Sequence, residues 1–320
     1  MAFLESYFDE SSHEHGDLVL AGYASHVDSW AIFATAWKSC LREYDLPYFR
    51  MKDFRNPRSR LIRHLSEHQR EELLSILLGL IQRYAVIGVS CRINPDEYCS
   101  LVTPLFRSLF GSAYAVAVQL CTLILDRFLN AIPGRGHTLS VLLEDGHQNA
   151  LDAVKHLRDY KDESIPVDAS QLSQEINIIG ELAPPPVILG AVGLGGKRNH
   201  PPLQAADILA HCTLASSNAL CISVLEWLKK TVMHRECKCT KELIQHIIAA
   251  LIKDEIKRSD RRSEIHQLSR FLGWCGVKVY PIQGGIAIDA RSPMPIDIER
   301  MLKSDPSISL IPGDDKDNQR

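Results

Sequence analysis

Short apolar runs of strand length alternate along this chain with longer segments of helical periodicity. The runs LVLAGYAS (18–25), AVIGVSCRI (85–93) and HTLSVLLEDG (137–146) predict strands, and EELLSILLGLIQRY (71–84) predicts a helix. Because strands and helices alternate, the order favours a mixed α/β fold over residues 1–220, in which helices flank a mixed sheet.

Four further segments receive a prediction from their local pattern. The run PYFRMKDF (47–54) is expected to be a third strand that ends at an acid, and QEINIIG (174–180) a later one. The Pro- and Gly-rich stretch 184–202 predicts a loop, and PLQAADILAHCTLASSNAL (202–220) predicts one helix.

The last third of the chain differs in character from the rest. Residues 221–320 are expected to form a mainly helical region with a short β-like stretch, VKVYPIQGGIAIDA (277–290), and a polar tail. Basic residues outnumber acidic ones between Lys229 and Arg270. These basic helices are the predicted surface for a nucleic-acid partner, although a solvated helical face would show the same pattern.

Composition limits the classes of function. A net charge of −3 lacks the strong positive field of an obligate nucleic-acid coat, so any binding surface should be local. The nine cysteines show no repeated spacing, which indicates a reducing, cytoplasmic setting rather than a disulfide framework. The longest apolar run, 113–125, is shorter than a membrane span, so no membrane association is expected.

Acidic residues stand where predicted elements end. Asp9 and Glu10 close the opening run YFDE, and Glu144 and Asp145 close the apolar strand 137–146. Asp207 lies among alanine, isoleucine and leucine in LQAADILA, where an acid is costly to bury without a partner. Since neighbouring strand residues face opposite sides, Asp9 is expected to face inward and Glu10 to support it.

Two interpretations of these acids remain open. Asp9, Glu144 and Asp207 together would supply only oxygen ligands, which suit Mg²⁺ or Mn²⁺, and such ions promote phosphodiester hydrolysis. Alternatively, Gln204, Asp207 and His211 form an exposed stripe on one helix face, because their spacing is three and four residues.

Three short motifs resemble a known family. The segments YFDES (7–11), FRMKDF (49–54) and PLQAADILA (202–210) are similar, in order and spacing, to motifs of the bacterial domain-of-unknown-function family 3800. The resemblance covers roughly residues 7–220. It implies a ribonuclease H-like fold and a metal-dependent nuclease site, in a family often found near mobile elements and phage-defence genes.

The resemblance also implies roles for particular residues. The first-strand acid of the family falls on Asp9 with Glu10 beside it, its third-strand acid on Asp53, and its helical acid on Asp207. Glu144 enters by analogy with ribonuclease H-like sites, in which a central strand ends in an acid, and Asp145 is the alternative at that position.

Two positions depart from the family pattern. Ser12 stands where the family usually has glycine, and Arg50 stands where it often has histidine. The chain is therefore predicted to be either a nuclease that uses Asp9, Glu10, Asp53, Glu144 and Asp207, or a non-catalytic module of the same fold that binds a protein or nucleic-acid partner.

Three weaker motifs allow a functional interpretation beside a plain one. Gly193–Gly196 with the following Lys197 and Arg198 forms either a phosphate-cradling loop or an ordinary loop. His13 and His15 are either proton carriers at the site or part of a solvated turn. The sequence HRECKC (234–239) lacks the second ligand pair of a zinc finger.

Overall fold

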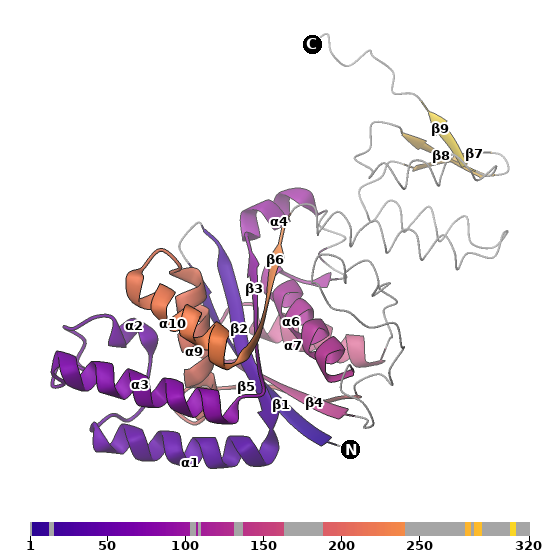
Figure 1. Ribbon diagram of the computed structural model, residues 1–320. Helices are drawn as coiled ribbons and strands as arrows, with labels where there is room; N and C mark the ends of the chain where they lie inside the picture. Colours follow the sequence, from indigo (N-terminus) through magenta and orange to yellow (C-terminus); the bar gives the residue numbers. More distant parts are fainter. Residues whose placement is uncertain are drawn as a thin grey trace, which may run out of the picture. The chain divides into compact units, whose positions relative to one another are not determined.

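The computed structural model describes most of the first three quarters of the chain and three later strands (Figure 1). The described residues are 2–12, 16–102, 107, 110–130, 137–162 and 188–240, and the strands at 279–282, 285–289 and 308–311. The chain divides into two compact units, and the first comprises residues 1–95, 111–163 and 176–239.

Six strands of the first unit form one mixed sheet in the order β5-β4-β1-β2-β3-β6. β1 pairs in parallel with β4 and antiparallel with β2, β3 is antiparallel to β2, and β5 and β6 extend the two edges in parallel with β4 and β3. The strands are β1 (Ala2–Ser12), β2 (Leu18–His26), β3 (Ile87–Ile93), β4 (His137–Glu144), β5 (Ile188–Gly195) and β6 (Met233–Cys239).

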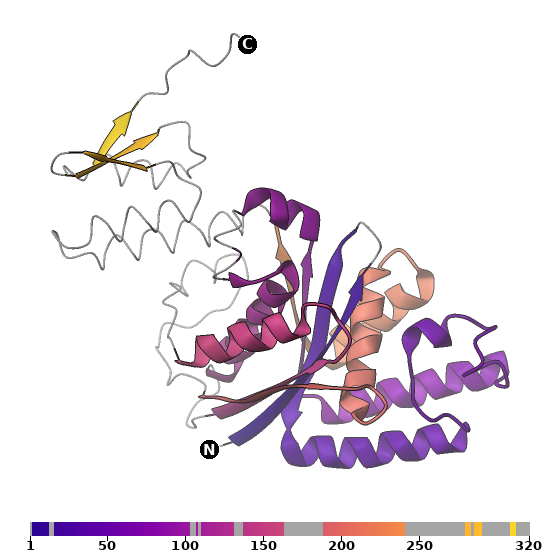
Figure 2. The same cartoon turned by 180° about the vertical axis from the view of Figure 1, so that it is seen from behind.

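Helices cover both faces of this sheet, which confirms the predicted α/β class (Figures 1 and 2). One layer consists of α1 (Val27–Glu43), α3 (Glu67–Tyr84), α9 (Pro201–Leu214) and α10 (Ala219–Thr231), with α9 directly on β1 and β2. The other layer consists of α6 (Ala113–Asn130) and α7 (Ala150–Asp162).

The core follows from the hydrophobic pattern of these elements. β2 is buried on both faces, as expected of a central strand between two helical layers. Trp30, Phe33 and Trp37 recur at three- and four-residue spacing on α1 and pack in one cluster with apolar residues of α3, α9 and α10. α9 is buried nearly all round, so its few polar side chains must find partners inside the protein.

The predicted strand at 47–54 is wrong. Met51–Phe54 form a single helical turn, α2, preceded by an extended Arg50. The backbone N–H groups of Phe49 and Met51 donate to side chains of α9 instead of to a neighbouring strand. Because these donors are satisfied by side chains, the extended segment needs no place in the sheet.

The predicted loop at 184–202 is also wrong in part. Ile188–Gly195 form β5, an edge strand paired with β4. Its glycines lower the strand propensity of the segment, but they allow close approach to β4, since a Cβ at Gly190 would crowd Ser140. The predicted strand at 174–180 lies outside the described residues.

The predicted helix 202–220 is two helices. α9 ends at Leu214, and α10 begins after Asn218, whose side chain accepts a hydrogen bond of 3.3 Å from Cys221 N. The chain then forms β6, so the first compact unit continues to Cys239. Among the described residues no single helix is long and apolar enough to cross a membrane, and only α9 with α10, bent by 118°, would pass together.

The second unit contains residues 96–110, 164–175 and 240–320. Its described elements are α4 (Pro95–Leu101), which starts at the boundary, and a three-stranded sheet in the order β7-β8-β9. β7 (Val279–Ile282) and β8 (Gly285–Asp289) confirm the β-like stretch, and β9 (Ile308–Ile311) pairs in parallel with β8. The predicted basic helices after residue 240 lie outside the described residues.

Candidate functional site

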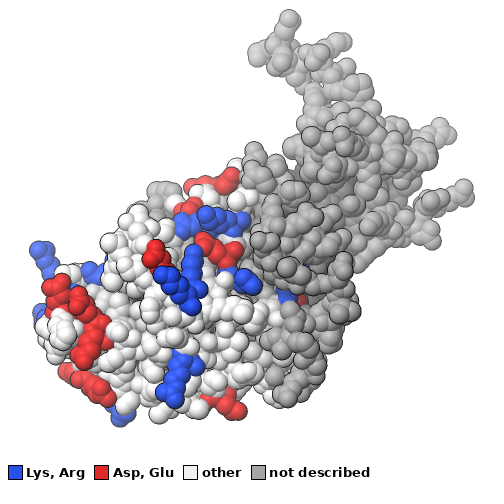
Figure 3. Space-filling model, viewed as in Figure 1, with Lys and Arg blue, Asp and Glu red and all other residues white. Residues whose placement is uncertain are grey.

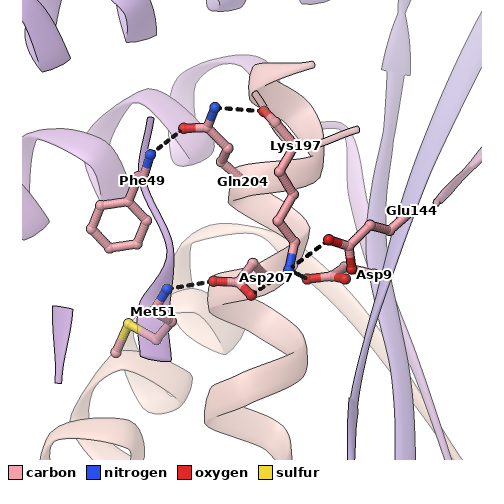
Figure 4. Close-up of polar contacts among 7 residues, drawn as sticks. All are labelled: Asp9, Phe49, Met51, Glu144, Lys197, Gln204 and Asp207. Atoms are coloured by element: carbon pink, nitrogen blue, oxygen red, sulfur yellow. Dashed lines mark hydrogen bonds and ion pairs between the residues drawn. The ribbon is translucent and has the colours of Figure 1, made fainter. Parts of the chain in front are cut away.

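Three carboxylates converge on one ammonium group (Figure 4). Lys197 Nζ lies 2.8 Å from Asp9 Oδ2, 2.8 Å from Asp207 Oδ1 and 3.1 Å from Glu144 Oε1. We call these four residues the acid cluster. The three acids are those that the sequence analysis grouped as metal ligands, and the structure brings them together.

The sheet explains why Asp9 and Glu144 meet. β1 and β4 are parallel neighbours, and Phe8 is the register partner of Leu143. The next residues along the two strands, Asp9 and Glu144, therefore lie side by side at the same end of the sheet. β4 ends at Glu144, whereas β1 continues past Asp9 and Glu10 to Ser12, so the predicted strand end at these two acids is wrong. The cluster forms where β4 ends beside β1, two interior strands of the sheet.

Asp207 reaches the cluster from α9, which lies across β1 and β2. Its Oδ1 accepts from Lys197 Nζ, and its Oδ2 accepts a hydrogen bond of 2.5 Å from Met51 N. Each carboxylate oxygen of Asp207 therefore has a donor, which compensates for placing an acid in an apolar helix.

Gln204 stands one helical turn before Asp207 and fixes the surroundings of the cluster (Figure 4). Its Oε1 accepts hydrogen bonds from Phe49 N (2.7 Å) and Trp37 Nε1 (2.9 Å), and its Nε2 donates to Lys197 O (2.7 Å). One buried amide thus joins the segment before α2, helix α1 and the loop that carries Lys197.

Asp9 is the most deeply buried member of the cluster, with no exposed surface. Its Oδ2 forms the ion pair with Lys197, and its carboxyl group interacts directly with that of Glu144. Burial raises the pKa of Asp9 well above its usual range, and the nearby carboxyls of Glu144 and Asp207 raise it further, whereas Lys197 opposes the shift.

Lys197 is the cation of the cluster and is 9% exposed. Burial alone would lower the pKa of its ammonium group, but the charges of Asp9, Asp207 and Glu144 outweigh burial and raise that pKa. The group is therefore held in its charged form. With all four groups ionised, three negative charges face one positive charge, so the cluster retains a negative excess.

The other predicted acids lie around the cluster or outside it. Glu10 follows Asp9 on β1 and is half-buried; burial raises its pKa, and the nearby Glu144 contributes to that rise. Asp53 accepts a hydrogen bond of 2.8 Å from Ser59 Oγ within the loop after α2. Asp145 is exposed and its carboxylate lies beside Gly196. At the end of β4, Glu144 rather than Asp145 is paired with Lys197.

The exposed-stripe interpretation of α9 is wrong. Gln204 is 2% exposed and Asp207 7% exposed, and both are fully engaged in contacts. His211 is half-buried, and its Nε2 lies 2.8 Å from Arg55 Nη1. The three side chains do share a helix face, but that face meets the protein interior and the segment around α2.

Sequence reasoning missed two residues near Glu144. Tyr114 of α6 and His147, just after β4, stack with ring centroids 4.1 Å apart. The acids Asp9, Glu10 and Glu144 add to the effect of burial in raising the pKa of Tyr114, whereas burial lowers the pKa of His147. His147 follows the Glu-Asp-Gly sequence at the strand end, and that position was the available signal.

The weaker motifs have separate outcomes. Gly193–Gly195 belong to β5, and Lys197 enters the acid cluster through its side chain. His13 and His15 lie outside the described residues. His234 Nε2 lies 3.1 Å from Ser90 Oγ, while Cys237 and Cys239 are buried on β6.

Comparisons with known proteins identify no family for this chain. No protein-family model matches the chain, and no curated protein matches it. The resemblance to family 3800 therefore stays a prediction, and the function must be argued from the site itself.

Proposed function

We propose that the acid cluster is the active site of a ribonuclease H-like, divalent-metal-dependent nuclease. The observation that carries the proposal is the convergence of Asp9, Glu144 and Asp207, from two neighbouring strands and one helix, within 3.1 Å of a single point. Three acids drawn from such distant parts of the chain indicate a site for a cation.

The chemistry of the residues fits Mg²⁺ or Mn²⁺. All three candidate ligands are carboxylates, and the only cation paired with buried Asp9 among the described residues is Lys197. The ammonium of Lys197 takes the common centre, and with it there no group of three His, Cys, Asp or Glu side chains among the described residues is placed so that it could hold a metal ion. Asp9, Glu144 and Asp207 would hold the ion once that centre is free.

A bound divalent ion supplies Lewis-acid activation of water and of phosphate oxygens. The protein's own residues then have distinct tasks. Asp9 and Glu144 define one side of the site from the sheet, and Asp207 closes it from α9. The Nδ1 of His147 accepts a hydrogen bond of 3.1 Å from Asn149 N, which leaves Nε2 to carry the proton of the neutral ring near Glu144. His147 is therefore a proton carrier of suitable placement.

Cations around the cluster favour a phosphodiester substrate. Arg50 is exposed and lies close enough to Glu10 for its positive charge to oppose the rise in the pKa of Glu10 that burial causes. Arg198, next to Lys197, is exposed and lies 5.1 Å from the centre of the Tyr48 ring, and Arg55 contacts His211 of α9. Exposed guanidinium groups beside an acidic site suit an anionic polymer whose phosphates they contact.

The distribution of charge over α10 and β6 also bears on where such a polymer would bind. Basic side chains gather over α10 and β6 with acidic ones among them (Figure 3). Lys229 of α10 is paired with Glu236 of β6 at 3.2 Å. The arginines beside the acid cluster are therefore the better support for phosphate contacts within the described residues.

One observation favours the second candidate, a non-catalytic module that binds a protein or nucleic acid. Lys197 already neutralises part of the negative charge of the cluster, so the three acids and the lysine are also consistent with a structural ion-pair network. In that case the fold needs no divalent ion, and binding would rely on the charged surface alone.

The experiment that separates the two candidates is cleavage of fluorescent single- and double-stranded DNA and RNA with Mn²⁺, Mg²⁺ or a chelator. Asp9→Asn and Asp207→Asn keep the side-chain shape and remove a charge, so we expect a fall in rate of about 100-fold or more. Glu226→Gln, at an exposed position of α10, is the control. Absence of metal-dependent cleavage by the wild type on all four substrates would favour the binding module.

A further inference from the structure

We propose that Lys197 is a built-in counter-cation that competes with the divalent ion for the same three carboxylates, so that ion binding moves its ammonium away from the centre of the cluster. The inference rests on the proposed metal-dependent function. It concerns which group neutralises the carboxylates in the absence of the ion, and which side chain moves when the ion binds.

The distances between the carboxylate oxygens and Lys197 Nζ show why the ammonium and a divalent ion compete for one position. The carboxylate oxygens lie 2.8–3.1 Å from Lys197 Nζ, a spacing suited to an ammonium group. Mg²⁺ prefers oxygen ligands at about 2.0–2.1 Å. The two cations therefore cannot share the centre, and the acids would have to draw closer around the ion after the ammonium leaves.

The attachment of Lys197 indicates which part of it can move. Its backbone carbonyl accepts a hydrogen bond of 2.7 Å from Gln204 Nε2, and Gln204 is itself fixed by Phe49 and Trp37. The backbone of the loop is thereby held. Among the described residues, the polar contacts of Nζ are with the three acids, so only the flexible side chain has to swing.

The charges explain why the site would tolerate both states. In the absence of a divalent ion, the ammonium offsets the repulsion among three carboxylates, one of which is fully buried. A divalent ion carries twice the charge of the ammonium and would offset the repulsion among the carboxylates in its place. The displaced ammonium stays tethered beside the site, next to the exposed Arg198, where a phosphate oxygen of the substrate is its natural partner.

The test measures Mn²⁺ binding directly, without a substrate. Lys197→Met keeps the length of the side chain and removes its charge, and free Mn²⁺ is followed by electron paramagnetic resonance at constant pH. We expect the variant to bind Mn²⁺ on the order of tenfold more tightly than the wild type, because a positive charge at the same point has been removed. Lys229→Met, which removes a lysine paired outside the cluster, is the matched control.

A thermal measurement keeps the test informative if the variant is unstable. Without ions, Lys197→Met is expected to melt at a lower temperature than the wild type, and Mn²⁺ should raise its melting temperature by more than it raises that of the wild type. Lys197→Gln, which is uncharged but polar, should behave in the same direction with a smaller loss of stability.

The outcomes separate this inference from the proposed function. Equal Mn²⁺ affinity in wild type and Lys197→Met would overturn the competition while leaving the metal site in place. Weaker binding in the variant would also overturn it, because Lys197 would then support the ion. Absence of Mn²⁺ binding in both proteins would overturn the inference and the proposed metal dependence together.

Discussion

Replacing Gln204 with leucine tests whether one buried amide holds the site together. The change keeps a similar volume but leaves three buried polar groups without their partner: Phe49 N, Trp37 Nε1 and Lys197 O. An unsatisfied buried group costs about 1–3 kcal/mol. Since the exposed loops allow partial rehydration, we expect a loss of about 3–5 kcal/mol, a large part of the total stability of a typical domain.

The loss is measured by urea unfolding, followed by far-ultraviolet circular dichroism so that changes at Trp37 do not affect the signal. Trp37→Phe removes one of the three hydrogen bonds and should cost less than Gln204→Leu. Gln82→Leu, at an exposed position of α3, is the matched control and should change stability by about 0.5 kcal/mol or less. A loss below about 1 kcal/mol in Gln204→Leu would refute the assignment of Gln204 as the central clamp.

Three further predictions concern the sheet, a half-buried histidine and the arginines. A Cβ at Gly22 would overlap the backbone of β1, so Gly22→Ala should cost about 3 kcal/mol or more in urea unfolding, whereas Gly79→Ala, with open space around it, should be neutral or stabilising. Burial and the nearby Lys229 lower the pKa of His234 from 6.5 to about 4. The contribution of His234 to stability is therefore complete above pH 6.5 and is lost as the pH falls towards 4. His234→Phe should flatten that part of the pH–stability curve by up to about 3 kcal/mol, and an unchanged curve would contradict the shift. The double variant Arg50→Gln and Arg198→Gln should reduce the salt dependence of binding to a single-stranded oligonucleotide by a slope of about 1.4, while a double substitution of exposed lysines on α10 leaves it unchanged; equal effects of the two would remove the arginines from the interface.

The three acids of the cluster and most of the elements around them could be predicted from the sequence. Periodicity predicted β2, β3, β4 and α3, and the end of β4 at Glu144 was predicted correctly, whereas β1 continues past Asp9 to Ser12. Asp9 still meets Glu144, because β1 and β4 are parallel neighbours. The apolar neighbours of Asp207 predicted burial only if a partner held the acid, and an exposed helix face remained the alternative until the structure showed the acid buried.

What the sequence did not reveal depends on contacts between distant residues. The segment at 47–54 looked like a strand because its propensity is β-like, but Gln204 and Asp207 of α9 supply the acceptors that a sheet would have supplied. β5 looked like a loop because of its glycines, although pairing with β4 decides its structure. The role of Lys197 could not be inferred, because a lysine next to an arginine in a glycine-rich stretch reads as a solvated loop.

The position of β1 in the middle of the sheet has a consequence for synthesis on the ribosome. The hairpin of β1 and β2 can pair as soon as residue 26 has emerged, but the other edge of β1 stays open until β4, at residues 137–144, has been made. Asp9 then still lacks its counter-charge, which arrives only with Lys197. A nascent chain that stops before Lys197 therefore holds a carboxylate that resists burial, and this charge discourages the open edge of β1 from pairing with other chains until the domain can be completed.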